Sequence, residues 1–404
     1  MRFHAFGLIT AVLCSYCSTV ASFAQPPKPN VIFILADDVG IGDIGTYGQQ
    51  TIPTPNLDQM AAEGIKYSQM YSGASVCSPS RAVLMTGLHN GRFNNGNGVN
   101  LRDSNVTVAE TLKSAGYQTA AFGKWHLGGS GASLPARQGF DEYFGILGAV
   151  DSWDHYQPNL QRNTSASPST VIPVANNFDN GNPRYTGDLF TDEASQYIRA
   201  KAQTGQPFYT QLNLQLAHFD LEVPELEPFT EGQSWPLARK IYGSMITRLD
   251  RMVGDVLNAV DDPNNDGDTS DSIAANTLIV FASDNGTHIE PAACCKGNHG
   301  PNLGVFSDDA HDPEFFDSNG QYRGWKRDVY DGGIKTPFIA RWAGTIAPGQ
   351  ENDSHFGDFA DFLPTVAELA GAEIPIGIDG ESYAHVLTGT TDETDFQRDF
   401  QYFE

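Results

Sequence analysis

Several separate apolar runs of this 404-residue chain end in charged or amide side chains. The runs cover residues 30–36, 117–122, 208–216 and 277–282. Continuous apolar runs of this length are typical of parallel strands covered on both faces. In open α/β sheets, ligands bind in the crevice beyond the carboxyl ends of the strands. The pattern therefore predicts an α/β fold with a mostly parallel central sheet, flanked by helices, and a polar site at one edge.

Carboxylate and amide side chains follow two of these runs. Asp37 and Asp38 end the first, and Asp284 and Asn285 end the fourth. Adjacent strand residues point to opposite faces, so both members of the Asp pair can reach one ion only if the strand stops there. Gly40 indicates that it does. An acidic loop in solvent is the usual alternative, but the buried run before the pair favours a metal site.

A second pattern lies at residues 77–85. Ser78 is expected to cap a helix, with Pro79 at its first position. Cys77 would then lie at the mouth of the helix, and Arg81, four residues on, would share its face. A helix N-terminus favours anions, and a guanidinium beside it strengthens that preference. The alternative is a buried cysteine before an ordinary helix.

Basic side chains follow the other two apolar runs. Lys124 and His126 come after the second run, and in an extended chain they share a face. His218 follows the third run. A single lysine–histidine pair usually lies on the surface, and a histidine after a strand is most often structural.

The motifs together resemble a known family. Cys77-Ser78-Pro79-Ser80-Arg81 resembles the Cys-x-Pro-x-Arg modification signature of type I sulfatases. Further elements similar to that family follow in its order, at residues 54–64, 123–128 (Gly-Lys-Trp-His-Leu-Gly), 283–286 (Ser-Asp-Asn-Gly) and 330–337. The chain from about residue 29 onward therefore resembles the formylglycine-dependent, arylsulfatase-like sulfatases of the alkaline-phosphatase superfamily.

This resemblance implies a metal ion and a modified cysteine. A formylglycine-generating or other sulfatase-maturing enzyme would convert Cys77 to 3-oxoalanine (formylglycine). The ion would be held by Asp37, Asp38, Asp284, Asn285 and the modified Cys77. An all-oxygen set suits Ca²⁺, with Mg²⁺ as the second candidate. One hydroxyl of the hydrated aldehyde would attack sulfur, and the second would then expel sulfate.

The resemblance also implies roles for the basic residues. Arg81 would hold the modified side chain, and Lys124 and Lys326 would bind sulfate oxygens. His218 would be the acid for the leaving alcohol, and His126 the partner of the nucleophile during elimination. The residues flanking His218 depart from the family pattern.

The segment 151–156 is polar and aromatic, which suits sugar stacking and hydroxyl recognition. Ser152, Trp153 and His155 are therefore expected to contact substrate, although aromatic residues are more often simply packed. The expected substrate is a sulfated carbohydrate or an aryl sulfate. The alternatives are a phosphate or phosphonate monoesterase on the same scaffold, or a non-catalytic carbohydrate-binding protein if Cys77 is unmodified.

Composition and the N-terminal sequence limit the possible partners and the cellular location of the protein. A net charge of −25 disfavours nucleic acid as a partner, so an anion site must be a local cationic island. Residues 1–24 are expected to be an export signal, which makes residues 25–404 a catalytic domain that is periplasmic or secreted. The first apolar run is too short and interrupted for a membrane span. Cys294 and Cys295 are adjacent, so no disulfide framework is implied.

Three stretches are expected to lie away from the site. Residues 159–183 are expected to form a long surface excursion. Residues 262–271 resemble the start of a calcium loop, but Ile273 replaces the acid in twelfth position, which favours a solvated acidic insertion. The small C-terminal antiparallel subdomain usual in such sulfatases is expected to be missing, as if the chain were truncated after residue 404.

Overall fold

The computed structural model describes residues 27–93, 98–164, 169–174, 183–229, 234–289 and 312–389, together with Met1, Ser167, Asn177, Tyr402 and Phe403. The expected export signal therefore lies almost entirely outside the described residues. The same holds for Cys294, Cys295, His311 and residues 398–401. None of the helices that the structure describes is both long and apolar enough to cross a bilayer.

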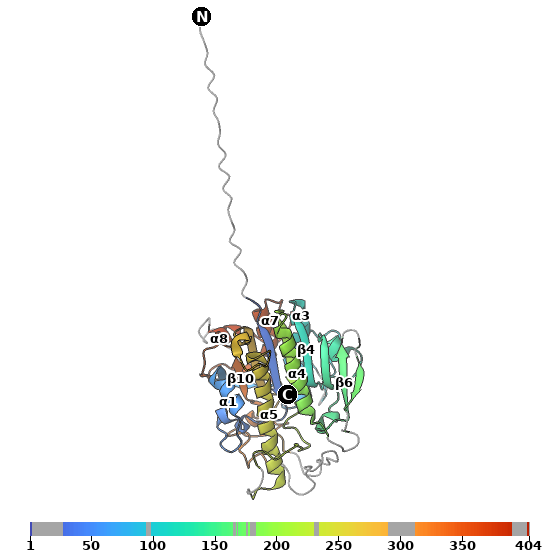
Figure 1. Ribbon diagram of the computed structural model, residues 1–404, viewed down its shortest axis with the longest axis vertical. Helices are drawn as coiled ribbons and strands as arrows, with labels where there is room; N and C mark the ends of the chain where they lie inside the picture. Colours follow the sequence, from blue (N-terminus) through green and yellow to red (C-terminus); the bar gives the residue numbers. More distant parts are fainter. Residues whose placement is uncertain are drawn as a thin grey trace.

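A ten-stranded sheet forms the centre of the molecule (Figure 1). Its five middle strands are mutually parallel, which confirms the predicted mostly parallel sheet. In spatial order the strands are β11 (Gln350–Asn352), β2 (Ile65–Tyr67), β10 (Phe338–Arg341), β9 (Thr277–Ser283), β1 (Asn30–Ala36), β8 (Phe208–Asn213), β4 (Gln118–Lys124), β5 (Glu142–Ile146), β6 (Asn159–Thr164) and β7 (Thr170–Pro173). A separate parallel pair joins β12 (Gly357–Asp358) to β3 (Met70–Tyr71).

One edge of the sheet corrects the expectation for residues 159–183. Within that stretch, β6 pairs antiparallel with β5, and β7 pairs antiparallel with β6. Leu160 and Asn163 of β6 are buried. The polar composition of the stretch hides this strand, because edge strands need only a few buried positions. The stretch therefore contains a paired hairpin where no strand was predicted, whereas the predicted surface location holds for β7, which is mostly exposed.

Helices cover both faces of the sheet (Figure 1). Each face has its own hydrophobic core. The first core includes side chains of α1 (Pro55–Ala62), α4 (Thr186–Ala202) and α5 (Leu237–Asp261). The second includes side chains of α2 (Cys77–Thr86), α3 (Val108–Ser114) and α7 (Phe362–Ala370). Two short helices, α6 (Asp331–Ile334) and α8 (Ala384–Thr388), lie in the C-terminal part. In β1, Ile32 and Ile34 face the first core, whereas Val31 and Phe33 face the second. This alternation explains the continuous apolar run, because both faces of the strand are buried.

The acidic segment after α5 forms a loop that is held by hydrogen bonds from its own backbone N–H groups. The Asp262 carboxylate accepts hydrogen bonds from the backbone N–H groups of Asp266, at 3.2 Å, and Gly267, at 2.9 Å. Residues 264–270 are exposed. The predicted solvent exposure of this acidic segment is therefore confirmed.

Candidate active site

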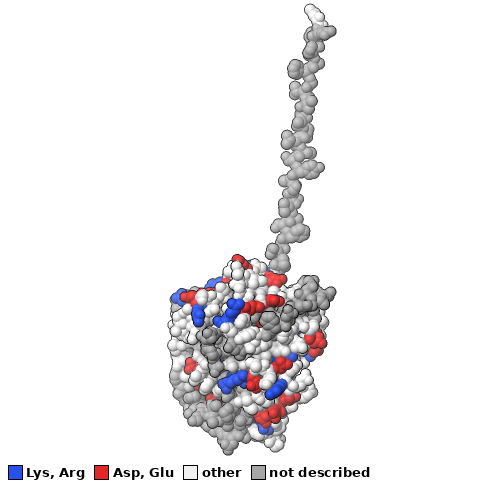
Figure 2. All heavy atoms as spheres, turned by 180° about the vertical axis from the view of Figure 1, so that it is seen from behind, with Lys and Arg blue, Asp and Glu red and all other residues white. Residues whose placement is uncertain are grey.

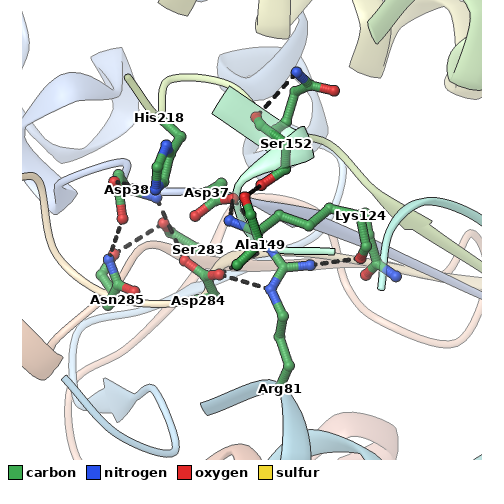
Figure 3. Close-up of polar contacts among 12 residues, drawn as sticks. Asp37, Asp38, Arg81, Lys124, Ala149, Ser152, His218, Ser283, Asp284 and Asn285 are labelled. Atoms are coloured by element: carbon green, nitrogen blue, oxygen red, sulfur yellow. Dashed lines mark hydrogen bonds and ion pairs between the residues drawn. The ribbon is translucent and has the colours of Figure 1, made fainter. Parts of the chain in front are cut away.

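The parallel strands bring their carboxyl ends to one edge, where the polar groups meet (Figure 3). Strand β1 ends at Ala36, and Asp38 has a left-handed backbone with φ of 61°. The backbone N–H of Asp284, directly after β9, donates to the carbonyl of Ala36 at 3.1 Å. The prediction that the first strand stops at the Asp pair is confirmed, and the two strand ends are in direct contact.

Arg81 lies between two carboxylates. Its Nε and Nη2 atoms are each 2.8 Å from Oδ2 of Asp284, and Nη2 is 3.5 Å from Oδ2 of Asp37. Its Nη1 donates to the carbonyl of Lys124 at 2.9 Å, and the Lys124 ammonium forms an ion pair with Asp37. All four side chains are almost fully buried.

Asp38 forms the second half of the cluster. Figure 3 shows it between His218 and Asn285. The Asn285 amide donates to Oδ1 of Asp38 at 2.6 Å, and Nε2 of His218 lies 3.6 Å from Oδ2. The Lys326 ammonium donates to Oδ2 at 2.8 Å, although the two residues are 288 positions apart in the sequence.

Helix α2 presents Cys77 to this cluster. Cys77 is the first helical residue and is buried. Its sulfur and one ligand atom each of Asp37, Asp38 and His218 all lie within 4.8 Å of one another. The predicted cap is wrong: the N-cap is Val76, and the Ser78 hydroxyl instead donates to the carbonyl of His126 at 2.9 Å. This bond ties the start of the helix to the segment after β4.

The donor atoms fit a hard divalent cation. Oδ1 of Asp37 and Oδ1 of Asn285 are buried without a hydrogen-bond partner among the described residues. Such orphaned oxygens are costly unless an ion or another donor completes them. Carboxylate and amide oxygens are the ligands that Ca²⁺ and Mg²⁺ prefer. His218 is an additional candidate ligand that the sequence did not assign to the metal.

The charges at this edge balance within the chain. Three carboxylates (Asp37, Asp38 and Asp284) face three permanent cations (Arg81, Lys124 and Lys326). A bound divalent cation would therefore make the site positive. This is the local cationic island that an anion site needs in a chain of net charge −25. On the face of the molecule drawn in Figure 2, by contrast, acidic and basic side chains are interspersed.

Burial and neighbouring charges set the pKa values of the three carboxyl groups. Burial alone would raise the pKa of Asp37, but Lys124 and the other cations around it lower the pKa well below its usual range. Burial opposes ionisation of Asp38 as well, yet the positive charge of Lys326 lowers its pKa to about 2. Asp284 differs, because burial and the neighbouring Asp37 raise its pKa to about 7.

The two histidines of the site are held neutral. Burial, followed by the charges of Lys326 and Lys124, lowers the pKa of His218 well below its usual value. Burial and Lys124 lower that of His126 to about 3. The carboxylates thus do not offset the crowded cations. The chain was expected to be extended from Lys124 to His126. His126 instead has a left-handed backbone with φ of 57°, so the chain turns after Trp125.

The Cys77 thiol is held protonated. Burial and the negative charge of Asp37 raise its pKa to about 12. The thiolate is the reactive form of cysteine, so an unmodified Cys77 is a poor nucleophile here.

The segment 151–156 changes one expectation. Ser152 and His155 are fully buried, and their polar atoms bond within the protein. The Ser152 hydroxyl donates to the carbonyl of Ala149 at 2.5 Å (Figure 3), and His155 Nε2 lies 3.1 Å from the carbonyl of His218. The expectation that these two side chains contact substrate is therefore corrected. They support the neighbouring loops instead. Trp153 is partly exposed and packs on Phe219, with ring centroids 5.0 Å apart.

Sequence reasoning missed His288. It is buried, its ring centroid lies 6.3 Å from that of His218, and it hydrogen-bonds to the backbone of Ala217. Its signal in the sequence was its position shortly after the polar end of the fourth apolar run. That position places it at the same sheet edge as Asp284.

Comparisons with known proteins agree with this geometry. The sulfatase family model matches residues 29–372. The chain is 31% identical to human arylsulfatase G over 93% of this chain and 72% of that protein, and 32% identical to bovine arylsulfatase A over 92% and 70%. Among solved structures, Ps i-CgsB in complex with k-i-k-neocarrahexaose is similar, with a TM-score of 0.69, 26% identity and coverage of 89% and 76%.

The family match includes every strand end that contributes to the cluster around Cys77, and the resemblance of the motifs agrees with the fold. This chain belongs to the sulfatase family.

Proposed function

We propose that this sulfatase hydrolyses sulfate monoesters of a carbohydrate, with residue 77 as the nucleophile after conversion of Cys77 to formylglycine. The observation that carries the proposal is the position of Cys77. It stands at the N-terminus of α2, within 4.8 Å of three donor groups of a buried cluster of acids and bases. An anion binds well at such a helix end when fixed cations surround it.

The modification supplies what the thiol lacks. A hydrated aldehyde offers two hydroxyl groups, one to attack sulfur and one to release sulfate. The divalent cation would be held by Asp37, Asp38, Asp284 and Asn285, with Ca²⁺ as the first candidate, and when bound it would polarise the sulfate oxygens. Conversion of Cys77 requires a sulfatase-maturing enzyme as a partner.

Two lysines are suited to hold the sulfate group. Lys124 and Lys326 each have one carboxylate partner, and an ammonium group has three N–H donors. The remaining donors can bind sulfate oxygens as negative charge shifts onto them. Arg81, whose guanidinium is held by Asp284 and by the Lys124 carbonyl, orients residue 77 four positions before it in the helix.

His218 is placed to protonate the leaving alcohol once the negative charge of a bound sulfate ester has raised its lowered pKa and Nε2 has taken up a proton. Its Nδ1 is in contact with the carbonyl of Phe219, so Nδ1 carries the hydrogen and Nε2 exchanges the proton. Nε2 faces Asp38 at the centre of the site. His126 has a buried Nδ1 without a hydrogen-bond partner among the described residues, and we assign it to the hydroxyl of residue 77 during sulfate release.

A carbohydrate is the favoured substrate. Trp153 and Phe219 form an aromatic pair next to His218, on the side where the leaving alcohol would lie. Phe219 is buried and supports Trp153, whose partly exposed ring is suited to stack on the apolar face of a sugar. The similar structure of Ps i-CgsB, which holds an oligosaccharide, supports the same class. Export through residues 1–24 to the periplasm or medium would give access to such a substrate.

The test is a panel of sulfated mono- and oligosaccharides, with aryl sulfates and the matched phosphate esters. The proposal expects release of inorganic sulfate, faster than phosphate release from the matched ester. Faster phosphate release would favour a phosphate or phosphonate monoesterase. Binding without any hydrolysis, after co-expression with a formylglycine-generating enzyme, would favour a carbohydrate-binding protein.

A further inference from the structure

The loop that carries His218 is joined to the segment 152–155 by a set of hydrogen bonds. The Gln215 side-chain amide donates to the carbonyls of Ser152, at 3.2 Å, and Asp154, at 3.1 Å. The backbone N–H of Asp220 donates to the carbonyl of Trp153 at 2.9 Å. These bonds fix the loop on either side of His218, and the His218 N–H donates to the carbonyl of Gln215 at 3.0 Å, so that only the His218 carbonyl is left to another group.

His155 supplies that group. Its Nε2 is 3.1 Å from the His218 carbonyl oxygen, and because a carbonyl only accepts, Nε2 must carry the hydrogen. This fixes the tautomer and leaves Nδ1 as an acceptor. The Tyr185 hydroxyl lies 3.2 Å from Nδ1 and 3.0 Å from the carbonyl of Glu222, so its one hydrogen is divided between these two acceptors. The His155 and Tyr185 rings stack with centroids 5.4 Å apart and an interplanar angle of 5°.

The backbone of His155 is held as firmly as its ring. Its N–H donates to Oε2 of Glu222 at 3.2 Å, and its carbonyl accepts from the N–H of Thr186 at 2.7 Å. The N–H, the carbonyl and Nε2 of this buried residue therefore each have a partner, and Nδ1 shares the Tyr185 hydrogen with the Glu222 carbonyl. A residue held in this way has a fixed position, and it can therefore fix the position of the His218 carbonyl that it contacts.

We propose that His155 and Tyr185 are positioning residues for His218. They hold the His218 peptide through its carbonyl oxygen, and thereby hold the ring at its place beside Asp38 and the leaving-group oxygen. Neither residue touches substrate. This inference rests on the proposed function, in which His218 protonates the leaving group.

The role makes a prediction that packing alone does not make. A sulfate ester of an acidic phenol hardly needs proton donation, whereas an ester of a weakly acidic phenol does. Misplacing His218 should therefore slow the esters with poor leaving groups selectively. Loss of packing would instead lower the amount of active enzyme and slow all esters by the same factor.

The experiment compares 4-nitrophenyl, 4-chlorophenyl and phenyl sulfate as substrates of the mature, cation-loaded enzyme. In His155→Leu we expect kcat for phenyl sulfate to fall about 10- to 100-fold, and that for 4-nitrophenyl sulfate less than about threefold, with little change in KM. Tyr185→Phe should shift the series in the same direction by a smaller factor. His155→Gln keeps an N–H donor near the position of Nε2 and should restore most of the phenyl sulfate rate.

A matched control uses another buried histidine that packs on a tyrosine. His355 is buried, and its ring lies 5.1 Å from that of Tyr383, in a different part of the fold. His355→Gln should leave the dependence on the leaving group as in the wild type. Equal losses on all three esters in both His155→Leu and Tyr185→Phe would overturn the positioning role while leaving the sulfatase function intact. A mature wild type inactive on these three esters and on the panel of sulfated saccharides would instead overturn the proposed function, and the positioning role with it.

Discussion

Two charged clusters of this molecule have similar compositions but different surroundings. At the carboxyl edge of the sheet, three acids face three bases in the protein interior. Between α4 and α5, a cavity of about 480 Å³ is also lined by acids and arginines. There Arg248 pairs with Asp188 and Glu225, and Arg251 lies 3.4 Å from Glu225, with side chains 14–48% exposed.

The difference is instructive because burial changes what charge costs. Desolvated ions destabilise a fold unless their partners are very well placed, whereas exposed ion pairs contribute little either way. A chain that keeps six charges buried around one cysteine therefore retains them for a purpose other than stability. The α4–α5 cluster carries no such implication, although it is hollow and strongly charged.

The largest expected effect is the loss of turnover when Cys77, the residue that the buried charges surround, is replaced. Cys77→Ala should reduce multiple turnover to background, because no group remains to attack sulfur. Cys77→Ser should also fail to turn over, because one hydroxyl cannot both attack and release. Steady-state sulfate release measures both, and normal turnover by either variant would refute the assigned nucleophile.

The next effect compares the two arginine environments directly. Arg81→Ala leaves Asp284 and Asp37 buried without their guanidinium, and it should lower the free energy of unfolding by about 3–5 kcal/mol. Arg251→Ala removes an exposed pair and should cost at most about 1 kcal/mol. Urea denaturation of both variants measures this contrast. Similar losses in the two would remove the distinction between the clusters.

Asp43 is a buried carboxyl group that has no cation partner among the described residues. Burial raises its pKa to about 7, against hydrogen bonds from Ser318, Tyr242 and Gly40. The folded state therefore holds a proton that the unfolded state loses near pH 4, so stability falls as pH rises from about 4 to about 7. Relative to Asp43→Asn, the wild type should lose at most about 4 kcal/mol across this window. Parallel pH profiles of unfolding free energy would contradict the assignment.

The smallest effect concerns cation binding. Ca²⁺ at about a hundredfold excess over its Kd should stabilise the folded protein by about 2.7 kcal/mol. Asp38→Asn should abolish the rise in Tm on adding Ca²⁺, and chelation should reverse that rise in the wild type. Asp188→Asn, in the α4–α5 cluster, should keep it. A rise of the same size in both variants would place the cation elsewhere.

Local patterns were enough to predict the buried strands and the residues at their ends. Each strand needed both faces covered, which made its apolar run continuous, and a polar residue marked the point where it left the sheet. Asp37, Asp284 and Lys124 could be grouped for this reason, since parallel strands end at a common edge. Lys326 could be included only through the family resemblance, because no local pattern joins it to Asp38.

Tertiary contacts decided what local patterns could not. Ser78 has the chemistry of a helix cap, but the approach of residues 99 and 126 takes its hydroxyl instead. His155 lies in a segment with the polar and aromatic composition of a sugar-binding loop, but the neighbouring loop that carries His218 covers its side chain. Strand β6 has few apolar residues because it is near an edge. For Ser78 and His155 the partners lie 48 and 63 positions away in the sequence, where propensity carries no information.

The central claim is that the buried charges act on a modified residue 77. The most direct measurement combines the mass of the peptide containing residue 77 with the sulfate-ester activity of the same preparation, over samples matured to different extents. The account predicts an aldehyde in place of the thiol, and activity proportional to the converted fraction. Full activity in a preparation whose Cys77 remains an unmodified thiol would contradict it.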